Sequence, residues 1–349
     1  MVWLLSPPEG EESKMVEQDV YLGTRLAMAE MLNNGVTAYA DHYFSPKAIL
    51  RAAEEMRIKT DLAITLFGFA PNYQEELKQS IALIQQNNKG SIHLRLGPHS
   101  PYTCSPAILS EIAKHAKILG CGLHIHVSET QNQVDESIKN YGKKPLEIVH
   151  ESGCLDVPCI IGHGLYITPE EHKLLRKDSI ISLSPKTYLK LAMGLGHMPD
   201  LIDDTHYAIG TDGAASSNTL NPLEQVRLLG LLLKDVHQDA RQAKLVQLWK
   251  LLMKGHEALP FNSGKLKEGY CADLIFWDLN QVNTMPIYNP LASILYSANE
   301  TNIKDLMING EWVKKDRRLI LDETLLIQEV NAQVQDLLAR GKGKAKVHF

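Results

Sequence analysis

The sequence predicts an α/β protein with a (β/α)8 barrel of the TIM type and a small β-rich accessory domain. Its 349 residues suit a barrel of about 250 residues plus an appendage. Short segments rich in Val, Ile and Leu alternate with amphipathic helical stretches, as in a parallel sheet covered by helices. After Gly255 the pattern changes to short strands and turns. We therefore expect a barrel domain at residues 1–255 and the accessory domain at residues 256–349.

Seven apolar segments have the length and composition of buried parallel strands. They are Val36–Phe44, Lys59–Phe67, Ser91–Pro98, Gly122–Ser128, Val157–Gly164, Ser179–Ser184 and Tyr207–Asp212. Helices are expected between them; in the helix at Ser105–Leu119, Ser105 can cap the N-terminus and Pro106 can open the first turn. A closed barrel needs an eighth strand, and a helix at Val20–Asn33 already precedes the first one found. The missing first strand is therefore expected upstream of Met1.

The C-terminal part carries weaker strand signals. GYCADLIFWDL, KDLMING and EWVKKDR read as short strands separated by turns, and a helix is expected from about Leu321 to Leu338. The last residues, ARGKGKAKVHF, are basic but lack interleaved aromatic residues, so a solvated tail is the preferred interpretation.

The composition favours a soluble protein that acts on a small molecule. Hydrophobic residues make up 44%, charged residues 22%, and the formal net charge is -5, so neither nucleic acid nor a membrane is expected as a partner. The five cysteines include no CxxC pair, which argues against a disulfide framework and favours the cytoplasm. The N-terminal segment resembles neither a signal peptide nor a membrane span. A homo-oligomer is compatible with these features.

Polar residues stand at the C-terminal ends of four predicted strands, where the side chains of such a barrel converge on one site. They include His99, His126, His163 and Asp212. Imidazole and carboxylate groups are normal ligands of a catalytic divalent metal, and the prime candidates are His126 and Asp212. A single polar residue at a strand end is more often a hydrogen-bonded loop residue. The coincidence of four favours a metal site.

His124 and His126 alternate with apolar residues, so both are expected to face the barrel interior. Only one of them need bind the metal. Glu129 follows His126 by three residues, just past the strand end, where a carboxyl group can act as general acid and base. His124 lies one layer deeper and is interpreted as a hydrogen-bonded core residue.

Four motifs in fixed order resemble those of the adenosine-type deaminases of the amidohydrolase superfamily. These deaminases act on S-adenosylhomocysteine or 5′-methylthioadenosine, and triazine hydrolases are related to them. The motifs are GPHSPYTCSP, HIHVSET, IIGHGLYI and IGTDGAASSN. Asp19–Phe44 and Gly264–Leu279 also look like family segments, so the resemblance runs almost from end to end.

The resemblance implies a role for each strand-end residue. His126 would be a metal ligand, Glu129 the proton shuttle, and His163 the imidazole that polarises or positions the metal-bound hydroxide. Asp212 would both bind the metal and accept a proton from the water. The expected metal is zinc, with iron or manganese as alternatives.

Two further residues would contact the substrate. His99 matches a substrate-binding histidine of the family, and Glu12 matches the acid that binds the ribose hydroxyls. Glu9 and Glu11 are alternatives to Glu12 because the loop is short.

The chain departs from the family pattern in three places. The family's HxH metal ligands lie on the first barrel strand, which this chain starts too late to contain, and half of the composite β-domain is absent for the same reason. Ser182–Lys190 replaces a motif of SHNP type. No arginine occurs between Arg57 and Arg95, where relatives that act on S-adenosylhomocysteine hold its carboxylate.

These features predict a metal-dependent hydrolytic deaminase of a purine nucleoside such as adenosine or 5′-methylthioadenosine, with S-adenosylhomocysteine as a further option. One alternative is a related amidohydrolase that acts on guanine, cytosine or a triazine. Another is a truncated, inactive chain with only two remaining metal ligands. If such a chain held metal tightly, His42 or His163 would have to replace the missing pair.

Overall fold

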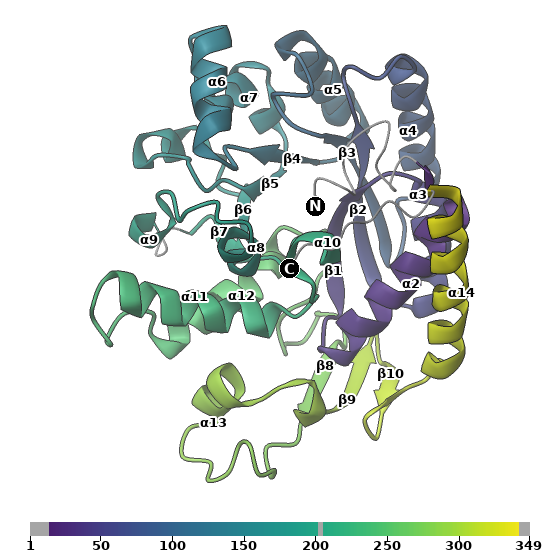
Figure 1. The fold of residues 1–349 in the computed structure, drawn as a ribbon, viewed down its shortest axis with the longest axis vertical. Helices are drawn as coiled ribbons and strands as arrows, with labels where there is room; N and C mark the ends of the chain where they lie inside the picture. Colours follow the sequence, from purple (N-terminus) through teal and green to yellow (C-terminus); the bar gives the residue numbers. More distant parts are fainter. Residues whose placement is uncertain (1–13, 202–204, 342–349) are drawn as a thin grey trace.

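The computed structural model describes residues 14–201 and 205–341. Seven parallel strands form one curled sheet in sequential order, β1-β2-β3-β4-β5-β6-β7, and Figure 1 shows them as an arc with helices on the outside. Each coincides with one of the seven predicted strands, so the barrel-type α/β fold is confirmed. Their bounds are β1 Ala38–Tyr43, β2 Lys59–Leu66, β3 Ile92–Pro98, β4 Leu123–Val127, β5 Cys159–His163, β6 Ile180–Leu183 and β7 Tyr207–Ile209.

The two edge strands of this sheet are β1 and β7, because neither has a second partner in the described part of the chain. Every residue of the inner strand β5 is buried, as expected for a parallel strand covered on both faces. Every residue of β1 is at least partly exposed, and Ala40 is exposed. The curled sheet is therefore open between β1 and β7.

The helices cover the outer face of the sheet. In α5, Leu109, Ile112 and Ala116 are buried whereas Ile118 is 80% exposed, as an amphipathic spacing predicts. Ser105 caps α5 as expected, its Oγ accepting a hydrogen bond from the Ile108 backbone N–H at 3.4 Å. The helix bounds are α2 Glu17–Asn33, α3 Pro46–Met56, α4 Tyr73–Asn87, α5 Pro106–Leu119, α6 Gln131–Tyr141, α7 Pro145–Glu151, α8 Pro185–Lys190, α9 Met198–Leu201, α10 Ala214–Ser217, α11 Pro222–Val236, α12 Leu245–Lys254, α13 Pro290–Ala292 and α14 Glu323–Gly341.

A second, antiparallel sheet follows in the order β11-β10-β9-β8, and the predicted C-terminal strands and helix are confirmed. It is tied to the barrel by a buried ion pair in which Lys59 Nζ lies 2.5 Å from Asp273 Oδ1. The C-terminal helix α14 returns beside α2 (Figure 1), where Arg25 pairs with Glu329 at 3.0 Å. The domain boundary at residue 255 stays a prediction. The strand bounds are β8 Leu274–Trp277, β9 Ile303–Ile308, β10 Glu311–Lys315 and β11 Arg318–Leu319.

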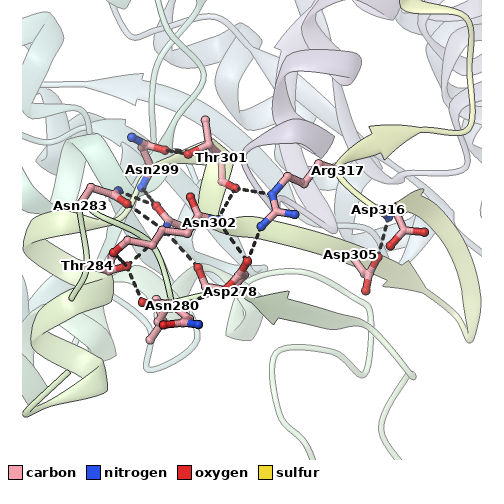
Figure 2. A network of polar contacts seen from close by, with 12 residues as sticks. Asp278, Asn280, Asn283, Thr284, Asn299, Thr301, Asn302, Asp305, Asp316 and Arg317 are labelled. Carbon is pink, nitrogen blue, oxygen red and sulfur yellow. Dashed lines mark hydrogen bonds and ion pairs between the residues drawn. The ribbon is translucent and has the colours of Figure 1, made fainter. Parts of the chain in front are cut away.

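A polar network around the buried Asn302 orders the long segment between β8 and β9 (Figure 2). Asn302 is fully buried, and its Nδ2 donates to the Asp278 carbonyl oxygen at 3.0 Å. Its Oδ1 accepts from Asn283 Nδ2 at 2.8 Å and from the Asn299 backbone N–H at 3.0 Å. The side-chain amide of Asn302 thus connects Asp278, Asn283 and Asn299.

Asn302→Ala is expected to lower the free energy of unfolding by about 3 kcal/mol, because it removes three hydrogen bonds made by a fully buried side-chain amide. Urea unfolding followed by circular dichroism measures the change. Asn280→Ala is the matched control: Asn280 is exposed, and only its backbone N–H bonds to Asp278. The control should change stability by less than about 0.5 kcal/mol. Equal midpoints for the two variants would show that the network does not stabilise the fold.

Candidate active site

The strand ends bring most of the predicted site residues together. His126 lies on β4 and His163 ends β5, and their ring centroids are 5.5 Å apart. His163 Nε2 lies 3.7 Å from Oε1 of Glu129, which follows β4. Asp212 follows β7, and its negative charge acts on both His126 and Tyr188. The parallel register explains this grouping, because Val127 of β4 stands beside His163 of β5.

Three non-glycine residues at these strand ends have left-handed backbone conformations. They are Ser128 with φ 50°, His163 with φ 68° and Asp212 with φ 60°. Such a conformation costs roughly 1–3 kcal/mol for a residue with a side chain, and it persists where the surrounding structure imposes it. Active sites are a common place for strain of this kind. The observed conformations therefore support the strand ends as the functional site.

The imidazole of His126 is oriented by a backbone carbonyl. Its Nδ1 lies 2.8 Å from the His99 carbonyl oxygen, so Nδ1 carries the proton and Nε2 keeps its lone pair. Burial lowers the pKa of His126, and the nearby His163 lowers it further. Gly162 permits this arrangement, since a Cβ there would lie 2.9 Å from His126 Cδ2. His126 is thus a neutral imidazole, the form that binds metals.

Three buried imidazole nitrogens beside this site have no hydrogen-bond partner in the described part of the chain: Nδ1 of His42, of His124 and of His163. The His42 ring lies 4.8 Å from that of His126 and 5.1 Å from that of His124. Burial lowers the pKa of both His42 and His124. His124 was expected to be a satisfied core residue, which is wrong for its Nδ1. Clustered unsatisfied nitrogens are typical of a site that takes a ligand.

The donor types suit zinc, but the described residues supply only part of a metal site. His126 Nε2 and the Asp212 carboxylate are the nitrogen and oxygen ligands that catalytic zinc takes, usually with a third protein ligand. No group of three or more His, Cys, Asp and Glu residues arranged to hold a metal occurs in residues 14–201 and 205–341. The assignment of His126 and Asp212 as metal ligands stays a prediction.

His99 packs against the same cluster. Its ring centroid is 4.8 Å from that of His126 and 4.9 Å from that of Phe67. Burial lowers the pKa of His99 to about 3, with smaller contributions from His126 and His163, so its ring is neutral at pH 7. This position suits a residue that contacts substrate. The other predicted substrate residue, Glu12, lies outside the described residues, as do Glu9 and Glu11.

Two residues beside the site, His42 and Tyr188, differ in whether a sequence pattern could identify them. His42 was named from the sequence only as a substitute metal ligand, although it stands near the end of the predicted strand Val36–Phe44, where the strand-end rule applies. Tyr188 follows β6 on α8, is almost fully buried, and packs edge-on against His163 at 5.9 Å. Its hydroxyl accepts a hydrogen bond from the Ser184 backbone N–H at 2.9 Å. No spacing or motif distinguishes Tyr188 from a core tyrosine.

Comparisons with known proteins give matches over most of the chain. The model of the Amidohydrolase family matches residues 2–313. A 5-methylthioadenosine/S-adenosylhomocysteine deaminase from Dictyoglomus thermophilum is 33% identical, over 97% of this chain and 81% of the relative. A 5′-deoxyadenosine deaminase from Methanosphaera stadtmanae is 34% identical, over 96% of this chain and 81% of the relative.

Solved structures share the fold. An adenosine deaminase from Xanthomonas campestris with bound zinc superposes with a TM-score of 0.90 at 26% identity, covering 97% of this chain and 80% of that one. An atrazine chlorohydrolase from Arthrobacter aurescens, complexed with zinc, gives a TM-score of 0.84 at 20% identity, covering 94% of this chain and 78% of that one. The second likeness concerns the fold alone.

Proposed function

Because the chain belongs to the amidohydrolase family, whose members use a divalent metal, we propose that it is a hydrolytic deaminase of a purine nucleoside such as adenosine or 5′-methylthioadenosine. The observation that carries the proposal is the convergence of His126, Glu129 and His163 at adjacent strand ends, with Asp212 acting on the same histidine. The deaminases among the relatives support ammonia as the leaving group. The zinc in the Xanthomonas structure supports zinc as the metal.

In this proposal, His126 Nε2 and the Asp212 carboxylate would hold the metal. When bound, a divalent cation activates water for attack at neutral pH. Asp212 accepts a proton as the water oxygen bonds to the ring carbon that carries the amino group. Glu129 protonates the adjacent ring nitrogen, and protons pass through Glu129 and Asp212 to the departing ammonia. His163, with Nε2 3.7 Å from Glu129 Oε1, orients the attacking water beside that carboxyl group.

The setting proposed for this reaction is the cytoplasm, with a small-molecule substrate. All five cysteines are free, which a reducing compartment favours. In the described part of the chain, no helix is both long and apolar enough to cross a membrane.

The two lysines of the Ser182–Lys190 segment are already paired. Lys186 Nζ donates to Glu224 at 2.7 Å and to Thr219 at 2.8 Å, and Lys190 Nζ bonds to Asn218. Neither lysine is therefore available to hold a substrate carboxylate without losing its present partner. No arginine occurs between Arg57 and Arg95 either, so that stretch also offers no guanidinium group to a substrate carboxylate.

Adenosine and 5′-methylthioadenosine are expected to be deaminated faster than S-adenosylhomocysteine, because Lys186 and Lys190 are already paired and no arginine between Arg57 and Arg95 can hold its amino-acid carboxylate. We expect a difference in kcat/KM of at least about tenfold, since an unpaired charge costs more than one lost contact. Ammonia release from the three compounds, with zinc supplied, measures it. A clear preference for S-adenosylhomocysteine would mean that Lys186 or Lys190 exchanges its partner for the substrate.

A competing hypothesis is a chain that folds but does not complete its metal site. Only His126 and Asp212 are candidate metal ligands among the described residues, whereas catalytic zinc generally has three protein ligands. This difference favours the competing hypothesis. It differs from the proposed function in a measurable way: such a chain would release no ammonia at any zinc concentration.

A further inference from the structure

The imidazole of His163 lacks the hydrogen bond that orients the imidazole of His126. Nδ1 of His163 is buried and has no hydrogen-bond partner in the described part of the chain, whereas Nδ1 of His126 lies 2.8 Å from the His99 carbonyl oxygen. The other nitrogen of His163, Nε2, is 3.7 Å from Glu129 Oε1, which is longer than a hydrogen bond. Packing therefore decides in which direction the His163 ring points.

Two rings pack against His163. The His126 ring stacks on it, with the centroids 5.5 Å apart and the planes at 27°. The Tyr188 ring meets it edge-on, at 5.9 Å and 62°. Stacked and edge-to-face arrangements are the two that aromatic rings prefer. Because His163 is only 6% exposed, its ring turns only if a neighbour moves.

Tyr188 is itself held firmly. Its phenol oxygen accepts a hydrogen bond at 2.9 Å from the backbone N–H of Ser184, the residue directly after β6. Helix α8, which carries Tyr188, is held from its other side, because the Lys186 backbone N–H donates to Gln225 Oε1 at 2.9 Å and Gln225 is fully buried. Tyr188 is 1% exposed. Its ring therefore offers His163 a fixed edge.

The phenol of Tyr188 does not exchange a proton at neutral pH. Burial raises the pKa of Tyr188, and the hydrogen bond from Ser184 opposes this shift. The negative charges of Asp212 and Glu129 raise the pKa further. A phenol that stays neutral beside two candidate catalytic carboxylates can act on the site through its position but not as an acid or a base.

We propose that Tyr188 is a positioning residue that holds the His163 imidazole facing Glu129. This inference rests on the proposed function, in which His163 orients the attacking water beside that carboxyl group. Tyr188 acts through His163, against which its ring packs. It belongs to the segment Ser182–Lys190, which departs from the family pattern, so the resemblance assigns it no role.

The mobility of the His163 ring tests this contact without any turnover. Carbon-13 relaxation of the Cε1–H groups in the histidine-labelled full chain measures it on the picosecond-to-nanosecond timescale, and His163→Gln identifies the signal by its loss. We expect the ring to become clearly more mobile in Tyr188→Leu and to stay ordered in Tyr188→Phe, which keeps the aromatic edge. Tyr73→Leu is the matched control and should leave the ring unchanged, since Tyr73 is also buried and its hydroxyl is bonded to Glu111 at 3.0 Å on the outer helix α4.

Ammonia release from 5′-methylthioadenosine, with zinc supplied, measures the effect on catalysis. Tyr188→Leu should lower kcat at least about tenfold and change KM less than about twofold, because a misplaced catalytic group slows the chemical step. Tyr188→Phe should keep kcat within about threefold, and Tyr73→Leu within about twofold. Rates are expressed per folded protein, measured by circular dichroism. Tyr188→Met is made beside Tyr188→Leu so that a folded variant without the ring is at hand.

The outcomes separate this inference from the proposed function. If the unmodified chain releases no ammonia, the proposed function fails and the catalytic role of Tyr188 fails with it. If the chain is active and the His163 ring stays ordered in Tyr188→Leu, the inference alone is wrong. Equal losses of kcat in Tyr188→Leu and Tyr73→Leu also overturn it, because a general loss of packing would explain both. A rise in KM at unchanged kcat does the same, since Tyr188 would then affect substrate binding instead of the position of His163.

Discussion

Glu129→Gln is expected to abolish ammonia release while leaving zinc occupancy near that of the unmodified chain. Glutamine keeps the shape of the side chain but cannot exchange a proton, and Glu129 is proposed to move protons without touching the metal. The side chain is partly exposed and lies beside His163, so the substitution should not disturb packing. Loss of general acid and base catalysis should lower kcat by about 10²–10⁴-fold. Ammonia release and zinc occupancy are measured on the same samples at a fixed free zinc concentration.

Gln133→Ala is a useful control for this variant. Gln133 contacts Glu129 through its side-chain amide, at 3.4 Å to Oε2, and its Oε1 accepts from the Glu129 backbone N–H at 3.0 Å. Removing it should slow the reaction far less than Glu129→Gln, because the proton-carrying group remains. The assignment of Glu129 fails if Glu129→Gln keeps a substantial part of the activity, or if it loses zinc as completely as a ligand variant.

Asp212→Asn is expected to damage both zinc binding and turnover. Asp212 is proposed to be a metal ligand as well as a proton acceptor, and asparagine removes the charge and the base together. With only two candidate ligands among the described residues, losing one should lower zinc affinity by at least about tenfold and bring ammonia release to background. Zinc occupancy after dialysis, measured beside the rate, tests both parts.

Asp135→Asn is the matched control, since Asp135 is an exposed carboxylate on α6. It should leave zinc occupancy and rate unchanged. If Asp212→Asn binds zinc normally and loses only activity, Asp212 is a proton acceptor and not a ligand.

The barrel strands could be predicted because they combine short apolar runs with helical spacing between them. Every residue of β5 is buried, and this leaves a continuous apolar signal in the sequence. The convergence of His126, His163 and Asp212 follows from the same rule, since parallel strands end at one edge. These features depend on local pattern and topology alone.

Features that depend on tertiary contact could not be predicted. The buried pair Lys59–Asp273 joins residues far apart in the chain, and neither position differs in sequence from a solvated charge. Phe69 looks like a strand or core residue, but the loop around Gly68 turns its ring outward. The left-handed backbone at His163 has no sequence signal because that conformation usually marks glycine.

The central claim is that these strand ends form a metal-dependent site for deamination. Its most direct test is ammonia release from 5′-methylthioadenosine while zinc is titrated into chelator-treated protein. We expect no activity without metal and a saturable rise with added zinc that dialysis reverses, because two protein ligands compete poorly with chelators. Ammonia release at the same rate in metal-free protein, or none at any zinc concentration, would contradict the claim.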